Sequence, residues 1–170
     1  MALTIDATAG GASANCYCTL AEAYTYHESR LHSMATWDAA DDGEEKTPAL
    51  IWATRLLDES VKWIGSKSTE TQALRWPRQY IYDIDGIEIE STIIPQFLKN
   101  ATAEFAFYLL SNDLTADDTR DLMGFEELKV GPISLKVDKY TKKPVLPRSV
   151  AYMVRRYSTI GRISKRLERM

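Results

Sequence analysis

The sequence is poor in the residues that enzymes and metal sites most often use. It contains two cysteines and two histidines among 170 residues. Cys16 and Cys18 are one residue apart, which is too close for an ordinary structural disulfide, and no second cysteine pair or histidine cluster completes a zinc site. A glycine-rich phosphate loop and the HExxH and GxSxG motifs are also missing. We therefore interpret both cysteines as reduced thiols and expect a protein that is not an enzyme and has no metal or cofactor.

Long apolar runs are absent as well. No stretch of about 18 apolar residues occurs, and the chain does not open with a basic segment followed by an apolar one. The hydrophobic fraction is nevertheless 45%, which lets 170 residues bury one sizeable core. We expect a soluble single domain without a membrane partner.

The remaining candidates for chemistry are a few carboxylates and one histidine. Glu104 lies inside an apolar segment and is the one carboxylate that a small hydrolase could use, but an ion pair is the interpretation that we favour. The acidic loops 38–46 and 83–86 lack the ligand spacing of a calcium loop and are interpreted as solvated turns. His27 lies alone on an apolar face, where a hydrogen-bonded core residue is far more common than a ligand.

Charge is distributed unevenly along the chain. Residues 1–141 contain 12 lysines and arginines against 23 acids, whereas residues 142–170 contain 9 against 1. A basic segment of this kind generally binds phosphates, an acidic protein surface or a neighbouring copy. The alternative is a solvated terminus that only maintains solubility.

Apolar residues recur at helical spacing in three segments. Thr47, Pro48 and Gly65 are suited to begin and end a helix whose apolar positions lie three or four residues apart. A capping box at Thr19–Glu22 predicts a second helix that continues to about Trp37. Pro95 begins a third, which extends to about residue 112.

Two segments have the alternation typical of strands. One surrounds Asp85-Gly86, which is a weak hairpin signal. The other covers residues 128–137, where Gly131-Pro132 is tolerated in an edge ribbon but not in a central strand. Together these patterns predict a mainly α protein: a small bundle of three main helices with a β-hairpin or ribbon extension and an extended basic C-terminal arm. The expected divisions are a flexible N-terminal arm (1–14), the bundle (15–125), the ribbon (126–147) and the basic arm (148–170).

The order of these segments resembles a known family. The most telling pieces are ATRLLD at 53–58, QALRWPR at 72–78 and VGPI at 130–133, within a similarity that spans about 15–157. By these pieces the chain resembles the head-tail connector proteins of tailed bacteriophages, also called adaptor or head-completion proteins. Related sequences are also labelled DnaT-like single-stranded-DNA-binding proteins.

The resemblance implies a structural virion protein at the capsid–tail junction, made in the bacterial host cytoplasm. Copies would form a ring, commonly twelvefold, beneath the portal, with tail or neck proteins below and double-stranded DNA passing through without sequence-specific binding. The basic arm would bind the portal, and aromatic residues would pack between subunits. For the portal we predict Arg155, Arg156, Tyr157, Ile160, Arg162, Ile163, Arg166 and Leu167, and for the subunit interface Trp52, Trp63, Trp76 and Arg78.

A single-stranded-DNA-binding accessory protein for replication is the main alternative. It would use the same basic segment, with Tyr152 and Tyr157 as stacking surfaces. The acidic body would repel phosphates, which is the observation that favours the connector at this point. A salt titration of single-strand binding separates the two hypotheses.

Overall fold

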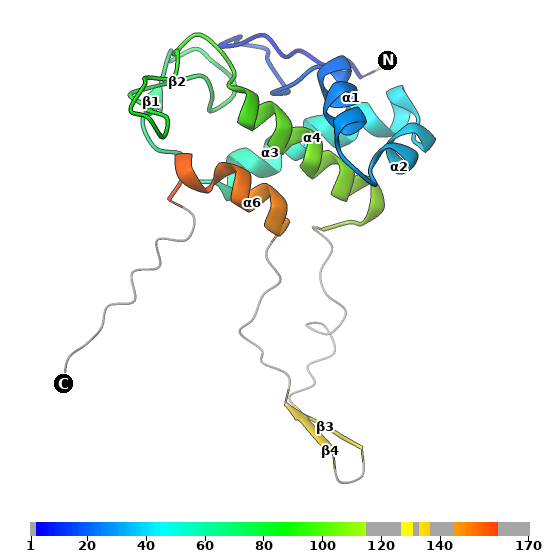
Figure 1. Cartoon of the computed structure of the whole chain (residues 1–170). Helices are drawn as coiled ribbons and strands as arrows, with labels where there is room; N and C mark the ends of the chain where they lie inside the picture. Colours follow the sequence, from blue (N-terminus) through cyan, green and yellow to red (C-terminus); the bar gives the residue numbers. More distant parts are fainter. Residues whose placement is uncertain (1–2, 115–126, 131–132, 137–144, 160–170) are drawn as a thin grey trace, which may run out of the picture. The chain divides into compact units, whose positions relative to one another are not determined.

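The chain is mainly helical, as predicted. The computed structural model describes residues 3–114, 127–130, 133–136 and 145–159. The helices are α1 (Leu20–Ser29), α2 (Met34–Ala39), α3 (Thr47–Ser60), α4 (Gln96–Ser111) and α6 (Arg148–Val154), with a π-helical turn at Asp42–Lys46 and a 3-10 turn, η2, at Arg155–Tyr157 (Figure 1). The strands are β1 (Ser66–Lys67), β2 (Arg78–Gln79), β3 (Glu127–Val130) and β4 (Ile133–Lys136). Across these described ranges, none of the helices is long and apolar enough to span a bilayer.

Two compact units make up the chain. The smaller covers residues 113–145 and contains the antiparallel hairpin of β3 and β4, in which Leu128 pairs with Leu135. This hairpin is the ribbon that the alternation predicts. The larger unit joins Met1–Asn112 to Leu146–Met170, so α6, which we assigned to a separate arm, belongs to the helical unit.

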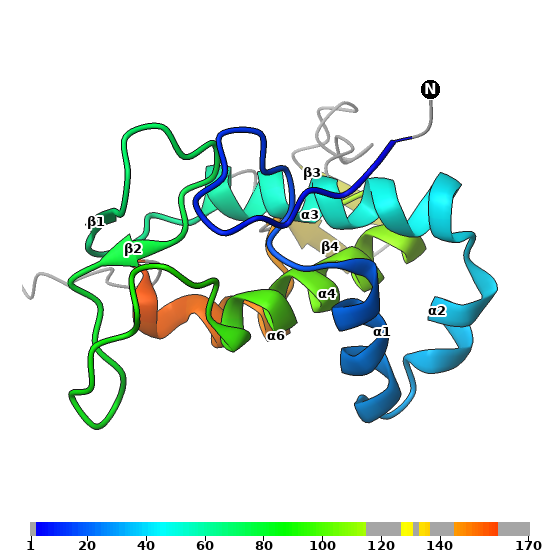
Figure 2. The same cartoon turned by 90° about the horizontal axis from the view of Figure 1, so that it is seen from above.

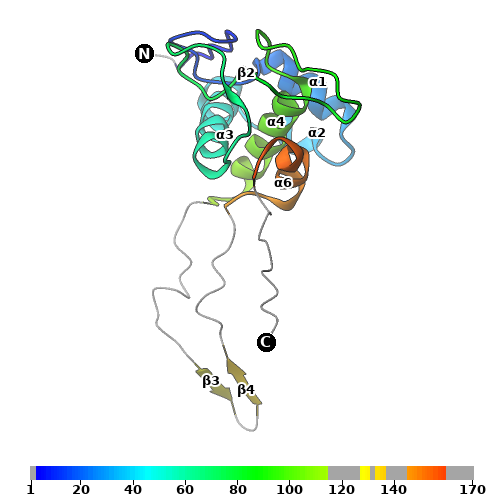
Figure 3. The same cartoon turned by 90° about the vertical axis from the view of Figure 1, so that its left-hand side faces the viewer.

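The core of the larger unit lies where α4 packs against α3 on one side and α6 on the other (Figure 3). Pro95, in an extended conformation, precedes α4 and gives the helix its start at the predicted place. Leu98 and Phe105 on α4 and Leu57 on α3 are fully buried, and alanines at the remaining contact positions allow the helix backbones to approach closely. This packing confirms the predicted pairing of the two apolar helices.

The helix that begins at Thr47 is shorter than its pattern predicts. It ends at Ser60, and Val61 is extended with φ −106° and ψ 121°. The residues that follow pair instead with the C-terminal part of the unit, since Trp63 forms an antiparallel bridge with Ser158. Gly65, which we expected to end the helix, has φ +71° inside the loop beyond it.

The first predicted helix is also interrupted. The capping box is confirmed, because the Thr19 hydroxyl accepts from the Glu22 amide at 3.2 Å and the Glu22 carboxylate accepts from the Thr19 amide at 2.8 Å. A single helix to Trp37 is wrong, since the backbone turns at His32, with φ +67°, between α1 and α2. One consequence is that Leu31, in the turn between the two helices, is 79% exposed.

Loops and short strands form the end of the larger unit opposite α1 and α2. Figure 2 shows β1, β2 and the C-terminal end of α6 together at this end. The N-terminal segment, expected to be flexible, contacts this region through the Ala73 amide, which donates to the Gly11 carbonyl at 3.1 Å. The hairpin predicted at Asp85-Gly86 is confirmed by a bridge between Tyr82 and Glu88 and by φ +81° at Gly86.

Candidate nucleic-acid interface

One face of α6 and η2 combines exposed basic side chains with an exposed aromatic ring. Pro147 precedes α6, and Val150 and Val154 are fully buried on the inner side of the helix. Helical periodicity therefore turns Arg148, Tyr152 and Arg155 outward on one face. We call this face, together with the exposed Arg156, the α6 surface.

The ring of Tyr152 lies between two guanidinium groups. The Arg155 guanidinium carbon is 4.8 Å from the ring centroid and that of Arg148 is 5.7 Å from it. The Arg148 Nη2 also donates to the Tyr152 hydroxyl at 3.4 Å. Both guanidinium groups lie over the ring, and the tyrosine nevertheless remains 51% exposed. Such contacts orient both kinds of side chain before any ligand arrives.

Tyr157, the other predicted stacking residue, is turned inward. Its ring stacks on Phe97 with centroids 4.1 Å apart and planes at 19°. The same cluster continues through edge contacts from Phe97 to Trp76 at 5.5 Å and from Trp76 to Trp63 at 5.7 Å. Tyr157 thus anchors η2 to the core, and of the two tyrosines Tyr152 is the exposed one.

The backbone after η2 is also fixed. The Ile64 amide donates to the Tyr157 carbonyl at 3.1 Å, and the Thr159 amide donates to the Lys62 carbonyl at 2.9 Å. Residues 62–64 are held in turn by Arg78, whose guanidinium donates to the carbonyls of Ile64 and Gly65, each at 2.6 Å. These hydrogen bonds therefore fix the backbone beneath the α6 surface.

Asp58 links three segments of the chain beneath the α6 surface. Its carboxylate accepts from the Tyr17 hydroxyl, from the Trp63 indole at 3.3 Å and from the Arg75 amide at 3.0 Å. Burial raises the pKa of this carboxyl above its ordinary value, although all three donors oppose the shift. The periodicity of the sequence gives no sign of this arrangement, because the partners lie 5 to 41 residues away.

The predicted partner-binding residues fall into three groups. Arg155 and Arg156 are exposed, and Tyr157 is half-buried. The other five lie outside the described residues: Ile160, Arg162, Ile163, Arg166 and Leu167. Only the first group contributes to the α6 surface, to which the structure adds Arg148.

The predicted subunit-interface residues are mostly buried within their own chain. Trp76 is 1% exposed, Trp63 7% and Arg78 9%, so they have little surface left for a second copy. Trp52 on α3 is 39% exposed and retains some. An interface role for these residues stays a prediction.

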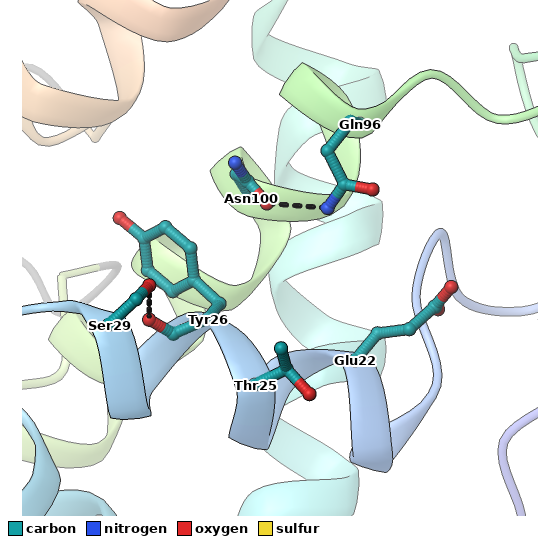
Figure 4. Close-up of a pocket in the computed structure, with 6 residues that line it drawn as sticks. All are labelled: Glu22, Thr25, Tyr26, Ser29, Gln96 and Asn100. Atoms are coloured by element: carbon teal, nitrogen blue, oxygen red, sulfur yellow. Dashed lines mark hydrogen bonds between the residues drawn. The ribbon is translucent and has the colours of Figure 1, made fainter.

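A polar hollow lies between α1 and α4. Its volume is about 310 Å³, and Figure 4 shows its side chains facing one another from the two helices: Glu22, Thr25, Tyr26, Ser29, Gln96 and Asn100. The Gln96 amide donates to Asn100 at 2.8 Å and the Ser29 hydroxyl donates to the Tyr26 carbonyl at 2.8 Å. Glu22 pairs with Lys99, and the Thr25 hydroxyl donates to the Ala21 carbonyl. None of the six lining residues has a buried side-chain polar atom without a partner, so they give no sign of a ligand.

The titratable groups singled out from the sequence have structural partners. Glu104, 2% exposed, accepts from the Tyr26 hydroxyl at 3.0 Å and from the Arg30 guanidinium at 3.1 Å. His27 is fully buried with Nδ1 3.2 Å from the Ser33 hydroxyl, which confirms the predicted core role, and burial lowers its pKa to about 4. Burial together with the Glu104 charge raises the pKa of Tyr26. In the described part of the chain, no three His, Cys, Asp or Glu residues gather in a way that could hold a metal ion.

Comparison with known proteins gives one match. A family model described as "Putative DnaT-like ssDNA binding protein" matches residues 1–170. No curated protein and no solved structure matches the chain.

This match overturns the head-tail connector hypothesis, and with it the predicted ring, portal, tail and through-passing duplex partners. Two of the segments that carried the resemblance, 53–58 and 72–78, are explained by packing within one chain, because Asp58 and Trp76 hold the loop 61–79 onto α3 and α4. Such core features do not identify a partner. With the whole of its length matched, the chain belongs to the DnaT-like single-stranded-DNA-binding protein family.

Proposed function

We propose that the protein binds single-stranded DNA through the α6 surface. The observation that carries the proposal is Tyr152, whose half-exposed ring is flanked by Arg148 and Arg155. An exposed aromatic face stacks on any unpaired base, and neighbouring arginines contact the phosphates on either side. The description of the family is consistent with this ligand.

A single strand fits the surface better than a duplex. Stacking on Tyr152 requires an unpaired base, because bases in a duplex are already stacked on one another. The α6 surface offers three exposed arginines and one ring, without a polar array that could read base edges. We therefore expect binding that depends little on sequence and strongly on salt.

The charge distribution limits where the strand can lie. Residues 1–141 have an excess of 11 acidic residues and residues 142–170 have an excess of 8 basic ones. Phosphates are repelled by the former and attracted by the latter, so the strand is directed to the C-terminal part of the chain. The acidity of the body, which we first took as an argument against DNA binding, here favours one orientation.

We also propose that the protein acts by binding alone, without catalysis. Glu104 supports this, because Arg30 and Tyr26 occupy its carboxylate oxygens. A catalytic carboxylate needs access to substrate, and this one is 2% exposed.

Fluorescence anisotropy with a labelled oligo-dT strand and a duplex of equal length tests the proposal. We expect tighter binding to the single strand. Tyr152→Ala should weaken it by about 1–3 kcal/mol, or roughly 5- to 150-fold, because one base loses its stacking partner. Tyr152→Phe keeps the ring and should retain most of the affinity.

Tyr82→Ala is the matched control. Tyr82 is also 51% exposed but lies outside the α6 surface, so its removal should not weaken binding. Equal affinity for strand and duplex, or equal losses in Tyr152→Ala and Tyr82→Ala, would contradict the proposal.

A further inference from the structure

A second exposed surface lies on the loop after β2. Five of the nine large hydrophobic side chains that are exposed in the described chain belong to residues 80–93, and they are between 45% and 76% exposed: Tyr80, Tyr82, Ile84, Ile87 and Ile93. Monomeric proteins seldom concentrate apolar side chains on one surface unless something binds there. We call this set the hairpin patch.

The backbone beneath the hairpin patch is ordered by hydrogen bonds. The Asp83 amide donates to the Ile87 carbonyl at 2.8 Å, and the Ile89 amide donates to the Ile81 carbonyl at 2.8 Å. Asp83 Oδ1 accepts from the amides of Asp85 and Ile87, both at 2.9 Å. Ile81 is fully buried and anchors the start of the turn. The isoleucines are thus held outward by a fixed turn.

The hairpin patch is surrounded by one sign of charge. Between residues 80 and 93 there are four acids, Asp83, Asp85, Glu88 and Glu90, and no lysine or arginine. A partner for this surface must supply apolar side chains together with positive charge. Nucleic acid brings negative charge, which the carboxylates repel, so the patch fits a protein segment.

Residues 160–170 have the required composition. Their apolar residues, Ile160, Ile163, Leu167 and Met170, recur three or four positions apart, and among them are four basic residues and one acid. The Thr159 amide, just before this segment, is hydrogen-bonded to the Lys62 carbonyl. Four residues further along, Ser66 pairs with Gln79, which directly precedes Tyr80 of the hairpin patch. The segment therefore begins near the hairpin patch. Eleven residues can span up to about 36 Å.

We propose that residues 160–170 dock on the hairpin patch of the same chain, with their apolar side chains against the isoleucines and their basic side chains against Asp83, Asp85, Glu88 and Glu90. The docking is independent of DNA. A consequence that rests on the proposed function is competition, because a bound strand would attract the same basic side chains away from the carboxylates.

The docking can be measured in the full chain by nuclear magnetic resonance. Glu168→Cys carries a nitroxide label at the one acidic position of the segment, and the native cysteines are each 1% exposed and shielded from labelling. We expect the label to broaden the amide signals of residues 82–88 selectively, and reduction of the label to restore them. Salt at about 1 M should weaken the effect, because the Debye length falls to about 3 Å.

Paired substitutions show whether the hairpin patch is the contact. Ile84→Ser with Ile87→Ser should abolish the broadening, and these side chains are exposed enough for the fold to tolerate the change. Leu31→Ser, at an exposed position in the turn between α1 and α2, should leave it intact. Folding of each variant is checked from its remaining amide signals.

Three results would overturn the proposal. One is the absence of broadening at residues 82–88, and another is broadening that survives the double isoleucine substitution. The third is the same broadening in a mixture of spin-labelled chains with separate isotope-labelled chains, which would make a second copy the occupant. Since no DNA is present, failure here leaves DNA binding to be judged by the anisotropy experiment alone.

Discussion

Tyr152 and Tyr82 expose the same fraction of their surface, 51%, yet their surroundings are opposite. Tyr152 is flanked by Arg148 and Arg155, whereas Tyr82 is bridged to Glu88 and followed by Asp83. The α6 surface therefore suits a polyanion and the hairpin patch suits a basic segment. The charges within a few ångströms of an exposed aromatic ring determine which class of ligand binds there.

The largest effect is expected from a substitution in the aromatic cluster that supports the α6 surface and the neighbouring loop. Trp76→Ala should destabilise the protein by about 3–5 kcal/mol, because a fully buried ring between Trp63 and Phe97 leaves a cavity. Chemical denaturation measures the loss. Trp52→Ala, at a 39% exposed position, is the control and should cost less than about 1 kcal/mol. Equal losses of unfolding free energy in the two variants would contradict this supporting role of Trp76.

Gly65→Ala should disturb the junction between the two surfaces. Gly65 has φ +71°, and an added Cβ would lie 2.4 Å from the Gln79 carbonyl oxygen and 2.8 Å from Ile81 Cδ1. Left-handed strain and overpacking together should cost about 2–4 kcal/mol. Gly86→Ala is the matched control, since Gly86 has φ +81° but open space around it, and only the strain of about 1 kcal/mol should appear. Thermal unfolding of the pair compares them, and equal shifts would show that the close contact is unimportant.

Acid should affect the end of the unit that contains α1 and α2, through His27. Burial lowers the pKa of His27 from 6.5 to about 4, so the unfolded chain binds the proton more tightly than the folded one. This contribution is fully present above pH 6.5 and is lost as the pH falls through 4, by about 3 kcal/mol. His27→Gln should remove that part of the pH dependence in denaturation curves. Asp58, with a raised pKa, contributes with the opposite sign and is unchanged in both proteins. Identical pH profiles would count against His27 as the source.

Arg155→Gln should alter the α6 surface alone, and only slightly. Each phosphate contact contributes about 0.7 to the slope of log affinity against log salt for a single strand, so the magnitude of the slope should fall by about 0.7. Arg55→Gln on α3, also exposed, should leave the slope unchanged. Titrations at several salt concentrations measure both, and an equal decrease in the two variants would mean that the strand does not select the α6 surface.

Sequence patterns predicted those parts of the fold that depend on neighbours along the chain. Pro95 marks the start of α4, Thr19 and Glu22 form the predicted capping box, and the alternation around Gly131-Pro132 corresponds to β3 and β4. Local propensity decides such features, so they can be found without a structure.

The remaining features depend on distant partners. The helix from Thr47 ends at Ser60 because residues 62–64 pair with residues 157–159, almost a hundred positions later. Tyr152 was among the predicted stacking residues, but Phe97 covers the equally promising Tyr157. The outward side chains of the hairpin patch were missed for a related reason: alternation indicates two faces without showing which one the rest of the chain covers.

The hydrogen bond from the Thr159 amide to the Lys62 carbonyl bears on what proteolysis of the chain would leave intact. It is placed after η2 and before residue 160, so a protease that cuts within the following basic residues would spare every contact that supports Tyr152. The same cut would release the segment that we propose as the occupant of the hairpin patch. Under both proposals, trimming after Thr159 would leave the α6 surface in place and expose the hairpin patch to a new partner.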